Sequence, residues 1–452
     1  MSHITSIMKK ELREMLTPGS VISVVIMVVL FAGLGMMING EVEKAASLPT
    51  IGIVAEEDAA YYTYVDEEGV TQEWNPVDYL KYIYGDYSDR IVVLNVSTSA
   101  TDSEIIEAMQ SQGVTSAVVF PSASDFRASM DSDTAVTVKQ LYVYQPTGMF
   151  GTVSTSAVTT VLSYVNSVMS SILIYEGGYD DYEFITNPVV YSTASTGTYV
   201  NGEVRTGISP DSITNTVTSQ TLMIPLVIMI IIMMVGSIVI SSMGSEKENK
   251  TLETLLTLPI KRTSIVAGKI IAAAIVGLAY GLAYLLGMSL YMGSMASMYS
   301  STGTTVDLSS IGMALDLVDW FLVLVSMFLA IVCALGICMI LGAFAKNYKS
   351  AQTMTMPLSI LAMIPMFIIM FSGWYGAGTV LQAVCFIIPF SHPMIAMQAL
   401  MYGDVTLVLE GVVYMAAFAL VTILITVKLY SSDILITGLG QNKYFQKLTG
   451  RK

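Results

Sequence analysis

The sequence predicts an α-helical polytopic membrane protein with six transmembrane helices and a mixed α/β extracytoplasmic domain. Hydrophobic residues make up 54% of the 452-residue chain and charged residues only 12%, which is too apolar for a soluble protein of this length. Apolar runs of about 20 residues, enough to cross a bilayer, recur along the chain. Residues 41–220 hold 24 of the 35 acidic but only 6 of the 21 basic residues. Lys and Arg are therefore concentrated in the remaining loops, as the positive-inside rule expects of cytoplasmic segments.

The chain is predicted to begin on the cytoplasmic membrane surface. Residues 1–20 form an interfacial amphipathic helix whose charged face carries Lys9, Lys10, Glu11 and Arg13. A Pro-Gly pair then breaks this helix. The first transmembrane helix is predicted at residues 21–40.

Residues 41–220 are predicted to fold as a separate α/β domain outside the cytoplasm. Thr101 and Glu104 have the spacing of a capping box before a helix that Gly113 ends. Apolar residues recur every three to four positions between Thr147 and Tyr175, which predicts a long one-faced helix. Strands are predicted at Thr50–Ala55, Arg90–Val96, Thr115–Phe120 and Ala135–Tyr144.

The second transmembrane helix is predicted at residues 221–243 and the third to sixth within residues 264–430. The stretch near 376–400 is apolar, but glycines and prolines interrupt it. A full crossing there would place the basic tail, residues 431–452, outside the cytoplasm, against the positive-inside rule. We therefore predict a re-entrant outer segment, with both termini cytoplasmic in a multi-pass protein of the cell membrane.

The loop at residues 244–263 is predicted to form a cytoplasmic helix with marked ends. Ser245 and Glu248 have capping-box spacing, and Pro259 prevents continuation of the helix. Leucines share one face, while charged residues occupy most of the rest. This pattern fits a membrane-held helix that a soluble partner pushes, and it also fits an ordinary surface helix connecting two spans.

The order of motifs resembles the membrane permeases of ABC type-2 transporters, in the branch with a large outer domain between the first two spans, which includes sodium and drug exporters. The resemblance rests on the loop pattern, on the N-terminal Lys-Lys-Glu-Leu-Arg-Glu run, on the stretch from Glu107 to Pro121, and on Ile388-Pro389-Phe390 with Pro393. It implies that the loop couples the permease to an ATPase. The coupling residues carried over are Glu246, Lys247, Glu248, Thr251, Leu252, Glu253, Leu255, Leu256, Pro259 and Arg262.

The resemblance also implies a permease that moves an amphiphile, drug or ion out of the cytoplasm as a homodimer with a separate cytoplasmic ABC ATPase. No phosphate-binding G-x-x-x-x-G-K-[ST] loop occurs in the sequence, so ATP and Mg are expected on the partner ATPase and no cofactor on this chain. No catalytic, metal or nucleic-acid site is predicted, and the remaining partner is membrane lipid. The alternative function is a membrane-anchored receptor or force-transmitting protein that relays movement to its outer domain without transport.

Asp316 and Asp319 lie three residues apart at the outer end of a predicted span. We interpret them as interfacial residues, with a cation site at an outer gate as the alternative.

Overall fold

The computed structural model describes residues 50–66, 68–146, 153–177, 181–251, 306–345 and 347–431, with scattered residues of 25–36 and 268–290. The chain divides into two compact units. The α/β unit contains Ile38–Thr218 and Thr302–Gly312, and the membrane unit contains Met1–Met37, Ser219–Ser301 and Met313–Lys452. The predicted fold class, a helical membrane protein with a mixed α/β domain, is confirmed.

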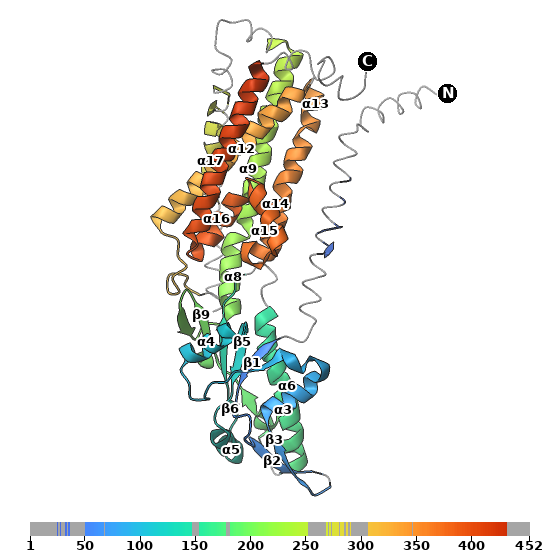
Figure 1. Ribbon diagram of the computed structural model, residues 1–452, viewed down its shortest axis with the longest axis vertical. Helices are drawn as coiled ribbons and strands as arrows, with labels where there is room; N and C mark the ends of the chain where they lie inside the picture. The colour runs from blue at the N-terminus through green and yellow to red at the C-terminus, as the bar shows by residue number, and fades with distance from the viewer. Residues whose placement is uncertain are drawn as a thin grey trace, which may run out of the picture. The chain divides into compact units, whose positions relative to one another are not determined.

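The α/β unit is built on a six-stranded mixed sheet with the strand order β10-β9-β7-β5-β1-β4 (Figure 1). Parallel pairs join β1 to β4, β1 to β5 and β7 to β9, while β5 pairs antiparallel with β7 and β9 with β10. The strands of this sheet are β1 (Ile51–Val54), β4 (Ile91–Val93), β5 (Ser116–Val119), β7 (Lys139–Val143), β9 (Thr196–Val200) and β10 (Glu203–Thr206). Two further pairs are β2 (Tyr62–Val65) with β3 (Thr71–Trp74), and β6 (Val136–Thr137) with β8 (Val189–Val190).

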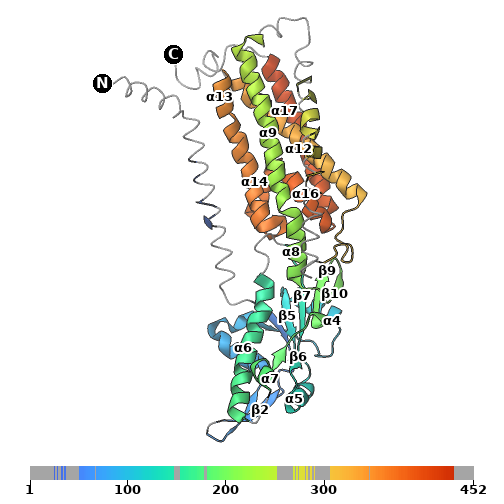
Figure 2. The ribbon, with the colours of Figure 1, turned by 180° about the vertical axis from the view of Figure 1, so that it is seen from behind.

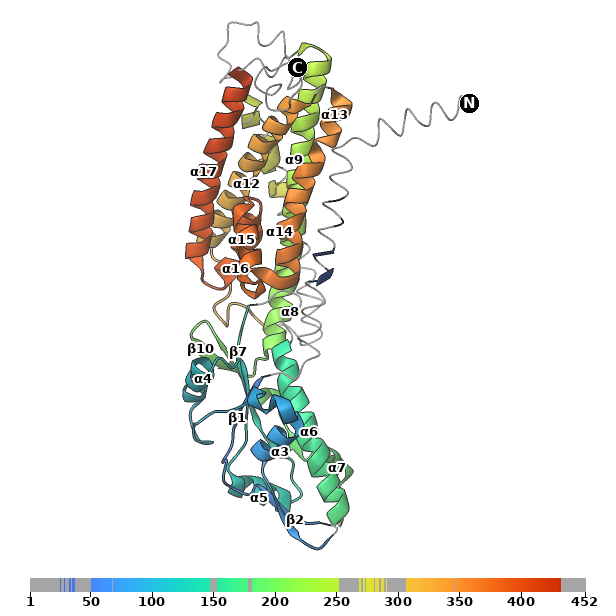
Figure 3. The same ribbon diagram turned by 45° about the vertical axis from the view of Figure 1, so that its right-hand side comes forward.

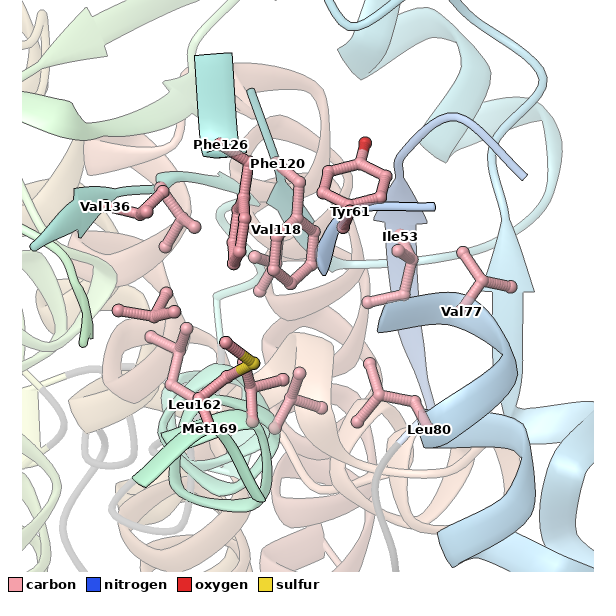
Figure 4. Close-up of a cluster of buried hydrophobic side chains, with 14 of the residues drawn as sticks. Ile53, Tyr61, Val77, Leu80, Val118, Phe120, Phe126, Val136, Leu162 and Met169 are labelled. Atoms are coloured by element: carbon pink, nitrogen blue, oxygen red, sulfur yellow. The ribbon is translucent and has the colours of Figure 1, made fainter. Parts of the chain in front are cut away.

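Helices cover both faces of this sheet because neighbouring strand residues point to opposite sides. Val118 packs in one buried cluster with residues of α6 (Val153–Glu176), as Figure 4 shows, whereas Val119 packs in another with residues of α4 (Asp102–Ser111). The other helices of the unit are α3 (Pro76–Tyr84), η1 (Gly85–Arg90), α5 (Ala123–Asp131), α7 (Tyr182–Thr186) and η2 (Thr193–Ser195). α8 (Pro210–Thr221) leads along the chain to the membrane unit.

The predicted capping box is present at the start of α4. Thr101 Oγ1 accepts a hydrogen bond from the Glu104 amide at 3.4 Å, and Glu104 Oε2 accepts one from the Thr101 amide at 2.8 Å. The bonds from Thr101 lower the pKa of the Glu104 carboxyl. Gly113 follows the helix with a φ of +69°, a conformation that favours glycine.

α6 is one of five helices, among the described residues, that are long and apolar enough to cross a membrane. Its apolar side is nevertheless used inside the α/β unit, where Val161, Val165 and Leu173 are fully buried. A helix of this composition thus serves as the core helix of the domain.

The membrane unit contains the four other helices of spanning length (Figures 1 and 2): α9 (Met223–Glu248), α12 (Leu317–Phe344), α14 (Thr355–Gly376) and α17 (Val405–Ser431). Glycines allow these helices to approach closely. A Cβ at Gly336 of α12 would lie 2.4 Å from Thr422 Oγ1 of α17, and a Cβ at Gly236 of α9 would lie 2.3 Å from Leu358 of α14. Such small-residue contacts are typical of helix pairs in lipid. The predicted span at residues 21–40 lies largely outside the described residues, and the predicted third span, at residues 265–290, is described only at scattered positions from Gly268 onward.

Two short helices, α15 (Thr379–Ile387) and α16 (Ser391–Met401), occupy the predicted re-entrant stretch. At 1.5 Å per residue, the 11 residues of α16 reach only about 16 Å, half of a hydrocarbon core. Every residue of α16 is buried. Figure 3 shows the pair at the end of the bundle where α14 ends and α17 begins.

Polar contacts hold this pair of short helices in place. His392 Nε2 lies 3.1 Å from the Phe386 carbonyl oxygen, and its ring packs edge-on against the ring of Phe386. Tyr414 of α17 donates to the Ile387 carbonyl at 2.6 Å. The histidine therefore has a structural role in joining α15 to α16.

Candidate functional site

The second transmembrane helix does not end where the sequence predicted. α9 continues through Gly244 to Glu248, so residues 244–248 are the end of the span and not the start of a separate helix. Gly244 is a contact residue and not a helix breaker, because a Cβ there would lie 2.6 Å from Ala351 Cβ and 2.9 Å from the Asn347 carbonyl oxygen. The Ser245–Glu248 capping box is therefore wrong, since Ser245 lies inside α9.

Lys247 joins this end of α9 to the end of α12. Its ammonium donates to the carbonyl oxygens of Ala345, at 2.9 Å, and Ala343. The last carbonyls of a helix have no partner within the helix and carry partial negative charge. A lysine supplied by a neighbouring helix both satisfies and neutralises them.

Glu246 joins α9 to the helical residues described from Gly268 onward. Its carboxylate forms an ion pair with Lys269, and both side chains are only about one-fifth exposed, at 23% and 22%. Ser242 also donates to Glu246, at 3.4 Å. Lys269 thus has a specific partner 23 residues earlier in the chain.

Glu248 joins α9 to α13 (Tyr348–Thr353). Its carboxylate accepts a hydrogen bond from the Tyr348 amide at 3.0 Å. Amides of the first helical turn lack internal partners and favour a nearby negative charge. We call Glu246, Lys247, Glu248 and Lys269, with the backbone groups they bind, the inner network.

The inner network changes the interpretation of the predicted coupling residues. Glu246, Lys247 and Glu248 were expected to face a partner, but each is engaged with another part of the membrane unit. Thr251 follows directly, and its hydroxyl donates to the Glu246 carbonyl at 3.0 Å. Outside the described residues lie Leu252, Glu253, Leu255, Leu256, Pro259 and Arg262, and also the N-terminal Lys9, Lys10, Glu11 and Arg13.

Asp316 and Asp319 form a reciprocal capping box at the start of α12. Asp316 Oδ1 accepts from the Asp319 amide at 2.8 Å, and Asp319 Oδ2 accepts from the Asp316 amide at 3.0 Å. Both carboxylates thus have a local structural role, and an outer gate at this position stays a prediction. Within the described parts of the chain, no three His, Cys, Asp or Glu side chains gather as a metal site.

Comparison with known proteins relates this chain to a family of transporters. A family model described as an ABC-2 family transporter protein matches residues 18–428. The chain is also similar to a crystal structure of a domain of a proposed ABC type-2 transporter from Thermotoga maritima, at 16% identity and a TM-score of 0.27, over 37% of this chain and 97% of that one. A TM-score this low carries no weight for the fold. Curated protein sequences give no match. Because the family model spans most of the chain, the chain belongs to the ABC-2 family of transporter proteins and is a membrane subunit of an ABC transporter.

Proposed function

We propose that the chain is the permease of an ABC exporter that moves an amphiphile, a drug or an ion out of the cytoplasm. The energy comes from ATP hydrolysed by a separate ATPase subunit, which holds the ATP and Mg. Two copies of the chain form the pathway as a homodimer, the simplest closed arrangement of identical subunits.

The inner network is the observation that carries this proposal. The part of the predicted coupling segment (244–263) that lies beyond the inner network, from Thr251 onward, connects the end of α9 along the chain to the helical residues described from Gly268. The inner network ties the same end of α9 to Lys269, to the last carbonyls of α12 and to the first amide of α13. A displacement of the coupling segment by an ATPase therefore acts on four helical elements together.

Glu253 is the best probe of the ATPase contact, because it belongs to the coupling pattern but not to the inner network. Glu253→Lys should lower both the ATPase activity that co-purifies with the tagged chain and ATP-dependent efflux, with normal membrane insertion. The control is Glu73→Lys, at an exposed position of β3 in the α/β unit. Unchanged co-purification and efflux with Glu253→Lys would contradict the coupling role.

We propose further that both termini are cytoplasmic and that residues 41–220 lie outside. The short α15 and α16, at the end of the bundle where α14 ends and α17 begins, support a re-entrant segment. In a variant without native cysteines, a cysteine at exposed Ser124 should react with an impermeant thiol reagent in intact cells, and one at Asn442 should not. Labelling at position 442 would contradict the six-span topology.

One observation favours the relay of movement as a second candidate function. Thr302–Gly312, part of the loop between the third and fourth predicted spans, belongs to the α/β unit. Asn201 Nδ2 donates to the Gly312 carbonyl at 3.2 Å, the Val306 amide donates to Thr216 Oγ1 at 3.3 Å, and Ile311 is buried. Since α12 follows this loop directly, motion of α12 would pull on the domain. ATP-dependent solute flux by the purified complex in vesicles separates the functions, because a pure relay gives none.

A further inference from the structure

A cavity of about 270 Å³ lies in the membrane unit between α9 and the helical residues described from Gly268 onward. The described part of its lining is almost entirely apolar, and the polar side chains in that part, Ser242 and Lys269, belong to or contact the inner network. The described lining residues are Val235, Ile238, Val239, Ser242, Met243, Lys269, Ala272 and Val276.

The cavity is half-open, and one end of it lies next to the point where the two helices meet. Gly277 allows this approach, since a Cβ there would lie 2.8 Å from Ile331 and 3.4 Å from Val235. Val235 and Ala274 are buried in the same cluster with Ile331, whereas Val276 is 41% exposed. The helices run antiparallel, so Val235 and Val276 form the apolar end while Ser242 and Lys269 form the polar end.

The length and polarity of this cavity indicate what it can bind. From Val235 to Ser242 the cavity follows two turns of α9, about 10 Å at 1.5 Å per residue. Apolar cavities exclude water and accept apolar ligands, and within a bilayer the abundant apolar ligand is an alkyl chain. At the polar end, the Lys269 ammonium has three N–H donors and Glu246 accepts from it. A further N–H can bind the oxygen of an acidic group.

We propose that this cavity binds one alkyl chain of a membrane amphiphile whose acidic head group, a carboxylate or phosphate, is bound by Lys269 and Ser242. The part of the chain next to the head group lies between α9 and the helical residues described from Gly268, and the rest continues past Val235 and the exposed side of Val276 into the bilayer. This site does not depend on the exporter function, and occupancy would stiffen the same end of α9 that the inner network holds.

The test uses the full-length protein in nanodiscs of uncharged phosphatidylcholine, irradiated with a photoactivatable palmitic acid or with its methyl ester. Mass spectrometry then locates the label. The acid should label α9 between Val235 and Met243 several-fold more than the ester does. Val239→Trp, which fills the cavity, should abolish this labelling.

Val413→Trp is the matched control, because Val413 is 69% exposed on α17 and lies outside the cavity lining. Labelling of α9 in the Val413→Trp variant should equal labelling of α9 in the unmodified protein. Labelling of α9 that survives Val239→Trp in correctly folded protein overturns the site. Equal labelling by the acid and the ester overturns the assignment of an acidic head group.

Discussion

The ion pair between Glu246 and Lys269 should be coupled energetically, which a double-mutant cycle can measure. Glu246→Gln or Lys269→Gln leaves the other charge without its partner among mostly buried groups. Losing one member of a fully buried pair costs about 3–5 kcal/mol, whereas exposed pairs contribute about 0.2–1 kcal/mol. With side chains 23% and 22% exposed, we expect each single variant to lose about 2–3 kcal/mol of unfolding free energy.

The double variant should lose less than the sum of the two single variants, because it leaves no unpaired charge. We expect a coupling energy of about 1–2 kcal/mol. The exchange Glu246→Lys with Lys269→Glu should restore much of the stability. Unfolding in mixed micelles, followed by circular dichroism, gives the four free energies. Additive single effects, or an exchanged variant no more stable than Glu246→Lys alone, would refute a direct pair.

Three other predictions follow from single contacts. Gly336→Ala should destabilise the protein by about 1–3 kcal/mol, since a Cβ there meets Thr422 at 2.4 Å. Gly287→Ala should not, since a Cβ there meets no described atom within 4 Å. Equal unfolding midpoints for the two variants would contradict this packing. Thr101→Ala should raise hydrogen exchange of the α4 amides about fivefold, as loss of a cap worth about 1 kcal/mol predicts. The pKa of the Glu104 carboxyl is lowered, so the protection that Glu104 contributes should be present at neutral pH and disappear in acid as the carboxylate becomes protonated. Asn201→Asp removes the amide donor to the Gly312 carbonyl and should raise exchange in residues 306–312, and unchanged exchange there would exclude this contact.

Local signals in the sequence predicted much of the α/β unit. The capping box at Thr101 was visible because its partners lie three residues apart, and α6 was visible from its periodic apolar face. The β2–β3 hairpin and α3 were not predicted. The strands of the hairpin have mixed polarity, and α3 depends on its cap, where Asn75 Oδ1 accepts from the Val77 amide at 2.7 Å.

The inner network could not be predicted, because its contacts join residues far apart in the chain. Lys247 binds carbonyls 96 and 98 residues later, and Glu248 binds an amide 100 residues later. The local sequence pattern instead paired Ser245 with Glu248 and ended the second span at residue 243. The glycine faces Ala351 of α13, a contact that only tertiary structure reveals.

The inner network also decides how coupling to an ATPase should be tested. Reversing Glu246 and Glu248 to Lys, the obvious test from the sequence, would remove the partner of Lys269 and place a positive charge beside the first amide of α13. Both changes damage the membrane unit. A loss of ATPase binding would then have two explanations, this damage or the loss of a direct contact with the ATPase. Glu253→Lys leaves every charge of the inner network in place. If Glu253→Lys uncouples the complex while the Glu246–Lys269 exchange preserves coupling, the contact lies beyond Thr251 and the inner network transmits its movement.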